Sequence, residues 1–114
     1  MKAIISKFLL AASVFMLALP AFAEETWSNV AMVDVACSAK AKANPDAHTR
    51  ACALQCQKSG FGVLTPDGDF LKLDDAGNAQ AIAALKSVKT EDHLRVTVTG
   101  TRDGNTIKVK SLKM

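Results

Sequence analysis

The sequence predicts a mainly β protein with two helices, in which five strands form a small antiparallel barrel and an added helix carries cysteines. Three observations predict this fold class. Short apolar runs alternate with turn-forming residues, as in a small β domain. A proline and a glycine mark the two ends of one helical segment. An alanine-rich stretch supplies a second helix between the third and fourth strands.

The strands are predicted from the spacing of apolar residues. A compact β-favouring run begins at Val30 and ends near Cys37, and two runs later in the chain alternate apolar with polar residues. Two short runs flank a Pro-Asp-Gly-Asp turn, which predicts a hairpin. In chain order the predicted elements are a strand at 30–37, a helix at 45–59, strands at 61–64 and 70–73, a helix that follows 74–78 and ends near 88, and strands at 94–99 and 107–110.

The first helix has a start signal and a stop signal. The Asn44 side chain can cap free backbone amides, and Pro45 has the backbone angle of a first helical turn. Gly60 is a typical residue after the end of a helix. We therefore expect one continuous helix over residues 45–59.

The first 23 residues have the three parts of a secretory signal peptide. Two lysines precede an apolar run at residues 8–19, and Ala-Phe-Ala at residues 21–23 offers a small-x-small cleavage site. The apolar run is shorter than the about 20 residues that a spanning helix needs. We expect residues 1–23 to be removed and residues 24–114 to form a single small domain, periplasmic or secreted, with no membrane span after cleavage.

Removal of the signal changes the charge. The chain has 14 basic and 11 acidic residues, and loss of Lys2 and Lys7 leaves 12 against 11, a formal charge of +1. The remaining aromatic residues are Trp27, Phe61 and Phe70. Nucleic-acid binding needs stacking aromatics and a stronger positive field, so nucleic acid is not an expected partner.

Two segments carry a resemblance to a known fold. They are GVLTPDGDFLKL at residues 62–73 and VTVTGT at residues 96–101. Around them, residues 60–112 resemble the oligonucleotide/oligosaccharide-binding (OB) fold, and especially small exported bacterial proteins with an OB-fold-like β-barrel. The resemblance implies a barrel with binding surfaces rather than one particular chemistry. The cysteine-bearing helix is an addition to the common OB plan.

Three cysteines and a histidine give the sequence its chemical character: Cys37, His48, Cys52 and Cys56. On a continuous helix, residues four apart stack about 6 Å apart along the axis, which places the last three in one row. Helical neighbours have Cβ atoms about 5–6 Å apart, whereas a disulfide needs about 3.5–4.5 Å. Cys52 and Cys56 are therefore not expected to bond to each other, and a disulfide must include Cys37.

Two interpretations of these residues stay open. In the first, Cys37 forms a disulfide with Cys52 or Cys56 and one thiol remains free, as is usual for small exported domains. In the second, thiolates and imidazole bind a soft ion, Zn²⁺ or Cu(I). His48 and Cys56 would lie about 12 Å apart along a straight helix, so one ion could take Cys37 and Cys52 with either of them but not with both.

An enzyme is not predicted. The sequence has no Walker loop, dinucleotide fingerprint, nucleophile elbow or two-histidine zinc helix. A reactive Cys52 beside His48 would need an orienting carboxylate, and the sequence does not name one. We expect a small OB-like binding or interaction module stabilised by a Cys37 disulfide, whose partner is an unknown protein or small ligand. The alternative is a soft-metal-binding protein, and Zn²⁺ or Cu(I) is the one cofactor indicated.

Overall fold

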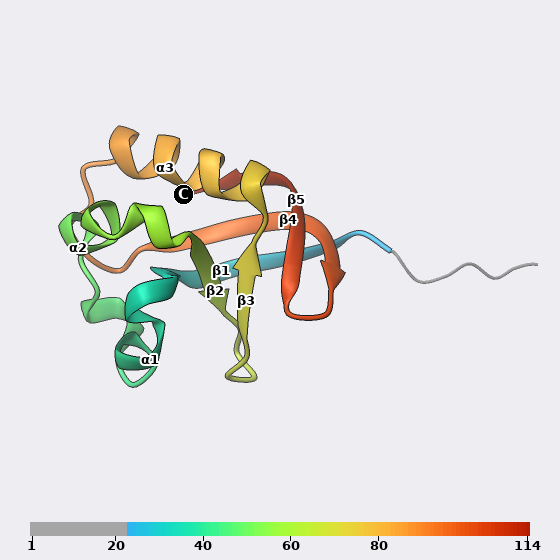
Figure 1. Ribbon diagram of the computed structural model, residues 1–114, viewed down its shortest axis with the longest axis horizontal. Helices are drawn as coiled ribbons and strands as arrows, with labels where there is room; N and C mark the ends of the chain where they lie inside the picture. The colour runs from blue at the N-terminus through green and yellow to red at the C-terminus, as the bar shows by residue number, and fades with distance from the viewer. Residues whose placement is uncertain (1–22) are drawn as a thin grey trace, which may run out of the picture.

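The computed structural model describes residues 23–114, in which five strands close into a barrel (Figure 1). Around the barrel the order is β1–β2–β3–β5–β4, and β4 pairs again with β1. The apolar run of the predicted signal peptide lies outside the described residues. The strands are β1 (Glu25–Asp34), β2 (Phe61–Leu64), β3 (Phe70–Leu73), β4 (Arg95–Asp103) and β5 (Thr106–Lys113).

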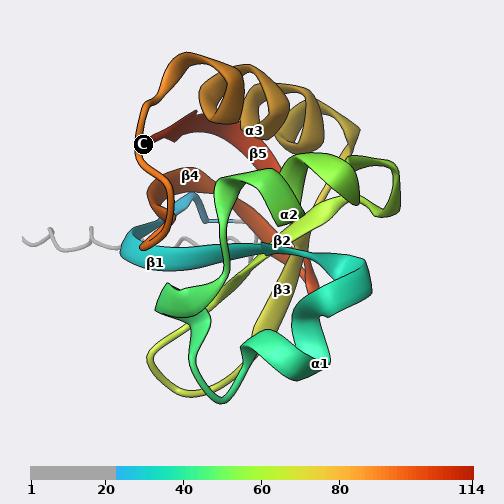
Figure 2. The same ribbon diagram turned by 90° about the vertical axis from the view of Figure 1, so that its left-hand side faces the viewer.

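Two short helices and three 3-10 turns join β1 to β2, and a longer helix joins β3 to β4. The segment between β1 and β2, residues 35–60, is called the insertion below. Figure 2 shows α2 on the same side of β1 as α3, and α1 on the opposite side. These elements are η2 (Val35–Cys37), α1 (Ser38–Ala41), η3 (Pro45–Ala47), α2 (Arg50–Gln55), η4 (Gln57–Ser59) and α3 (Asp75–Ser87).

The prediction of a barrel of five strands is confirmed, but the prediction of an antiparallel barrel is wrong at one seam. Strands β3 and β5 run parallel, with Lys72 opposite Thr106 and Leu73 opposite Ile107. The cause is the path of the chain. Helix α3 carries the chain from β3 to β4 without a hairpin, and β5 then folds back on β4 and meets β3 in the same direction.

The prediction of one continuous helix over residues 45–59 is wrong. Pro45 starts a 3-10 turn, His48 is extended (φ −70°, ψ 128°), and α2 begins only at Arg50. Asn44 makes no side-chain cap, whereas the Thr49 side chain accepts a hydrogen bond from the Cys52 amide. Thr49 is thus a second helix start signal inside the segment, and α2 begins after it as a separate helix.

The first predicted strand is displaced toward the N-terminus, because β1 ends at Asp34 and Cys37 lies in η2. The hairpin strands have the predicted bounds, and α3 and the last two strands lie where expected. The Asp74 side chain caps α3 by accepting from the Gly77 amide at 2.9 Å. No helix within residues 23–114 is long and apolar enough to cross a membrane.

The C-terminal half of β1 is covered on both faces. Val30 and Met32 belong to the main core, which fills the barrel and receives Ala53 from α2. Val33 belongs instead to a second cluster with Ala41 of α1. Because successive side chains of a strand point to opposite faces, α1 and α2 together bury this end of β1. The residue that ends the strand, Asp34, is therefore enclosed.

Candidate functional site

Asp34 is a fully buried carboxylate at the end of β1 (0% exposed). Its Oδ2 accepts a hydrogen bond from the Cys37 amide at 3.0 Å, which caps η2. Its Oδ1 lies 2.6 Å from Nε2 of His48. Since an ionised carboxylate can only accept, His48 donates from Nε2 and its Nδ1 is left as the unprotonated nitrogen when the ring is neutral.

The two ends of the insertion lie side by side next to Asp34. The Val35 amide donates to the Gly60 carbonyl at 2.8 Å, and the Ala36 amide donates to the Ser59 hydroxyl at 3.1 Å. Gly60 has a φ of +85°, a value that glycine adopts without strain. This pairing brings the residues that flank it, Cys37 and Cys56, toward each other.

Asp34, Cys37 and Cys56 form what we call the thiol–carboxylate cluster. One carboxylate oxygen and the two sulfurs all lie within 4.8 Å of one another. All three cysteines of the described chain are free thiols. Partial burial, the Asp34 carboxylate and the Cys56 thiol raise the pKa of the Cys37 thiol above its ordinary value. Chemically, the cluster can bind a cation or close as a disulfide.

The predicted row of His48, Cys52 and Cys56 does not form, because His48 lies outside α2 and Cys56 follows its end. The structure brings Cys37 and Cys56 together, joins His48 to them through Asp34, and leaves Cys52 exposed outside the cluster. Sequence reasoning missed Asp34. A lone carboxylate inside the apolar run 30–35 is a signal that could have found it, since a charge in such a run needs partners.

A cavity of about 370 Å³, the thiol pocket, opens beside the cluster. The His48 side chain is only 8% exposed, yet its Nδ1 makes no hydrogen bond with the described residues. The pocket is lined by Cys37, Lys40, Ala41, Asn44, Ala47, His48 and Cys52.

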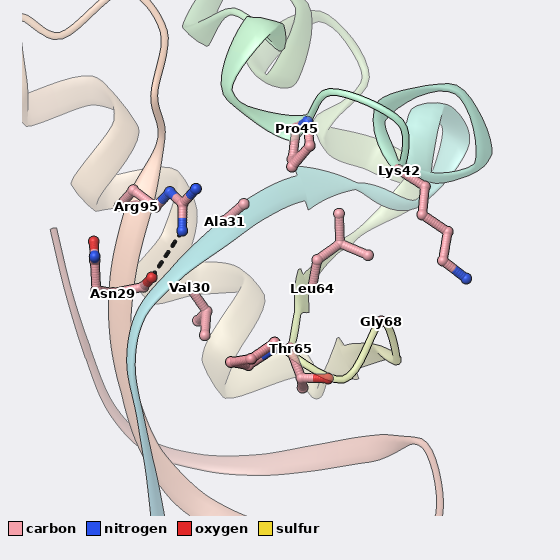
Figure 3. Close-up of a pocket in the computed structure, with 10 residues that line it drawn as sticks. Asn29, Val30, Ala31, Lys42, Pro45, Leu64, Thr65, Gly68 and Arg95 are labelled. Atoms are coloured by element: carbon pink, nitrogen blue, oxygen red, sulfur yellow. Dashed lines mark hydrogen bonds between the residues drawn. The ribbon is translucent and has the colours of Figure 1, made fainter.

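A second cavity of about 300 Å³, the Arg95 pocket, lies between β1, the β2–β3 turn and η3 (Figure 3). Ala31, Pro45 and Leu64 give it apolar walls, and Lys42 stands on the side opposite Arg95 (Figure 3). These walls and the Lys42 ammonium suit a small ligand with an apolar body and an anionic or carbonyl group.

Arg95 is held in place on the wall of this pocket. Its Nε and Nη2 donate to the two oxygens of Asp46, each at 2.9 Å. Its Nη1 donates to the Asn29 carbonyl at 3.0 Å, the bond drawn as a dashed line in Figure 3. Asn29 has a φ of +53° at the bulge where β1 shifts register against β4. The hydrogen bond from Arg95 holds the pKa of Asp46 below its usual value.

Comparison of the chain with family models, with curated proteins and with solved structures finds no match.

Proposed function

We propose that this protein is a small exported metal-binding module, periplasmic or secreted, in which an OB-type barrel carries a site for one soft metal ion. The thiol–carboxylate cluster carries the proposal, since its ligand atoms lie within 4.8 Å of one another. Bonds of about 2.0 to 2.3 Å place two ligands of one ion at most about 4.6 Å apart. Small side-chain movements therefore suffice to bring all three groups to one ion.

The donor set favours Zn²⁺ over Cu(I). Two thiolates suit either ion, but a carboxylate oxygen is an ordinary zinc ligand and a poor partner for Cu(I). Three protein ligands leave the fourth tetrahedral position open to water or to an outside ligand. In the predicted set of Cys37, Cys52 and Cys56, Asp34 thus takes the place of Cys52. His48 holds the carboxylate through Nε2, the role of a hydrogen-bonded partner behind a metal ligand.

The strand order and the helix positions support an OB-type assignment for the barrel. A five-stranded barrel with α3 between β3 and β4 agrees with the resemblance at residues 60–112. The insertion between β1 and β2 is the part added to that plan, and it contributes two of the three proposed ligands. The barrel would then act as a rigid support, and the insertion as the binding element.

Metal titration of the reduced mature chain, residues 24–114, tests the proposal. We expect one Zn²⁺ per chain, with Cys37 and Cys56 protected from a thiol reagent while Cys52 still reacts. Cys37→Ser and Cys56→Ser should each lower the Zn²⁺ affinity by more than about 100-fold, beyond the loss typical of a group behind a ligand.

Cys52→Ser is the matched control, because it removes a thiol that lies outside the cluster. It should keep the wild-type affinity. The proposal is wrong if the wild-type chain binds neither Zn²⁺ nor Cu(I), or if the control loses as much affinity as the two cluster variants. Preference for Cu(I) would keep the site and change the ion.

The nearness of the two sulfurs also favours a second candidate function, a disulfide-stabilised binding module. A bond from Cys37 to Cys56 would close the insertion as a loop and contribute about 3 kcal/mol. The Arg95 pocket would then be the binding surface for a small ligand or a protein. Thiol counting on chain isolated from its own compartment separates the two candidates, because one titratable thiol in denaturant supports the disulfide and three support the metal site.

A further inference from the structure

The thiol pocket and the thiol–carboxylate cluster share one residue, Cys37. Cys37 contributes its sulfur to the cluster and also lines the cavity of about 370 Å³ that opens to solvent beside it. Asp34 is fully buried and Cys56 does not line the cavity. Cys37 therefore makes this pocket one route from solvent to an ion bound at the cluster.

The pocket adds two donors that the cluster does not use. Cys52 is exposed on its wall, and its thiol is free. His48 lines the pocket, its ring is nine-tenths buried and fixed at Nε2 by Asp34, and its Nδ1 has no hydrogen-bond partner among residues 23–114. A sulfur and an unprotonated imidazole nitrogen are both ligands for a soft ion. The pocket thus has ligands on the approach to the site.

We propose that the thiol pocket is an exchange port, through which an outside thiolate delivers the ion to the cluster or removes it, with Cys52 as the transient ligand. The inference rests on the proposed metal-binding function. Lys40 lines the same pocket and favours the approach of an anionic thiolate. The outside thiolate belongs to a small thiol or to a cysteine of a carrier, and both have the same chemistry.

The exchange is a ligand substitution with no change of oxidation state. On entry, a bond forms between the ion and the Cys52 sulfur while the bond to the outside thiolate breaks, and the Cys52 thiol proton passes to water. Bonds to the Cys37 and Cys56 sulfurs and to a carboxylate oxygen of Asp34 then replace the bond to Cys52, and the two thiol protons pass to water. The released Cys52 thiolate takes up a proton from water. Removal of the ion follows the same steps in reverse.

Transfer kinetics test the exchange port. Mature chain loaded with Zn²⁺ is mixed with excess chromogenic chelator and increasing concentrations of free cysteine, and release of the ion is followed by stopped flow. In wild-type chain the release rate should rise with the cysteine concentration. Cys52→Ser should slow cysteine-dependent release by on the order of tenfold or more, because one ligand of the transition state is lost, while the equilibrium affinity stays unchanged.

His93→Gln is the control, because it removes a side chain that could bind a metal ion but lies outside the pocket. The His93 side chain is 67% exposed and does not line the pocket. It should release the ion at the wild-type rate. Equal rates for wild-type chain and Cys52→Ser would overturn the exchange port and leave the metal site intact. Failure of wild-type chain to bind Zn²⁺ or Cu(I) would overturn the proposed function and the port with it. The transfer rate is then measured with an ion-loaded carrier that holds the ion through a cysteine, in place of free cysteine. The source whose transfer rate depends on Cys52 is the source of the thiolate.

Discussion

At the scale of single residues, Asp34 organises the site. A buried carboxylate is tolerated when its oxygens are hydrogen-bonded, and Asp34 meets this condition through the Cys37 amide and the His48 ring. The same residue ends β1, caps η2 and lies within 4.8 Å of both cluster sulfurs. Structural and chemical roles coincide in one side chain, so a change at Asp34 should affect both.

Asp34→Asn tests this double role. The asparagine side chain has one oxygen, so it can accept only one of the two hydrogen bonds that Asp34 accepts. Its NH₂ group would face the second donor, either the Cys37 amide or His48 Nε2. We expect the reduced, metal-free chain to lose about 1–3 kcal/mol of unfolding free energy in urea. Asp67→Asn, in the exposed turn between β2 and β3, is the matched control and should change it by less than about 0.5 kcal/mol. Equal effects of the two variants would contradict the role given to Asp34.

The Asp46–Arg95 pair should make stability fall in acid. Arg95 lowers the pKa of Asp46 from its ordinary 3.8, so the folded chain binds this proton less readily than the unfolded chain. The pair therefore contributes stability above the ordinary pKa, and this contribution is lost as pH falls through the lowered value. Urea unfolding at several pH values between about 5 and 2 should show the loss. Asp46→Asn should remove this part of the acid dependence. If the variant and the wild-type chain lose stability equally as the pH falls, the Asp46–Arg95 pair is not its cause.

The sequence identified part of the candidate site at the residue scale. Cysteine and histidine are recognisable as ligands by type, so the sequence makes Cys37, His48, Cys52 and Cys56 candidates. Asp34 was not, because aspartate is common at the ends of strands and its burial depends on α1 and α2, which pack against β1 from two sides. Cys52 stands in one row with His48 and Cys56 only on a continuous helix, and the segment is broken at His48 and Thr49.

At the scale of elements, the insertion shows why that assumption failed. Pro45 and Gly60 are correct signals for the two ends of the segment, but tertiary hydrogen bonds divide it between them. The Arg50 amide donates to the Glu91 carbonyl at 2.8 Å, and the His93 amide donates to the Asp46 carbonyl at 3.0 Å. Local propensity cannot include bonds to residues forty positions away, which is why short-range patterns predicted the hairpin and α3 better than the insertion.

The packing of α3 on the barrel depends on Gly77. A Cβ at this position would clash with Cγ2 of Val109 on β5 and would lie 2.9 Å from Cβ of Leu73. Gly77→Ala should therefore destabilise the chain by about 1–3 kcal/mol, although alanine is the better helix former. Thermal unfolding measures the loss. Val109→Ala in the same chain should remove the shortest of these contacts, the one with Cγ2, so the double variant should lose less stability than the sum of the single variants. If the stability losses of the two single variants simply add in the double variant, the side chain at position 77 does not contact Val109.

At the scale of the whole molecule, the number and order of the strands follow from local patterns, and their pairing does not. Turn residues and alternation locate each strand, because these features depend on neighbours in the sequence. The parallel seam between β3 and β5 and the closure of β4 on β1 join segments far apart in the chain. Nothing in the spacing of apolar residues specifies such partners.

The expected mature chain begins at Glu24, directly before β1. Export of the full chain by a bacterial host should therefore yield a soluble product whose mass matches residues 24–114. Ala23→Leu places a large side chain at the cleavage site and should leave the unprocessed chain at the membrane. A mature product that begins elsewhere, or normal processing of the variant, would contradict the predicted cleavage site.

The closure of β4 on β1 sets the order in which the chain can fold. Trp27 pairs with Val98, so if the chain is exported as proposed, the first strand to leave the channel cannot pair until one of the last has followed. Contacts between such distant segments carry the largest loop-closure cost and form late. The barrel cannot be complete while the chain is in transit. During such transit the three thiols, which are free in the folded chain, would be exposed together on an unfolded segment, where a metal ion or an oxidant could react with them before the barrel closes.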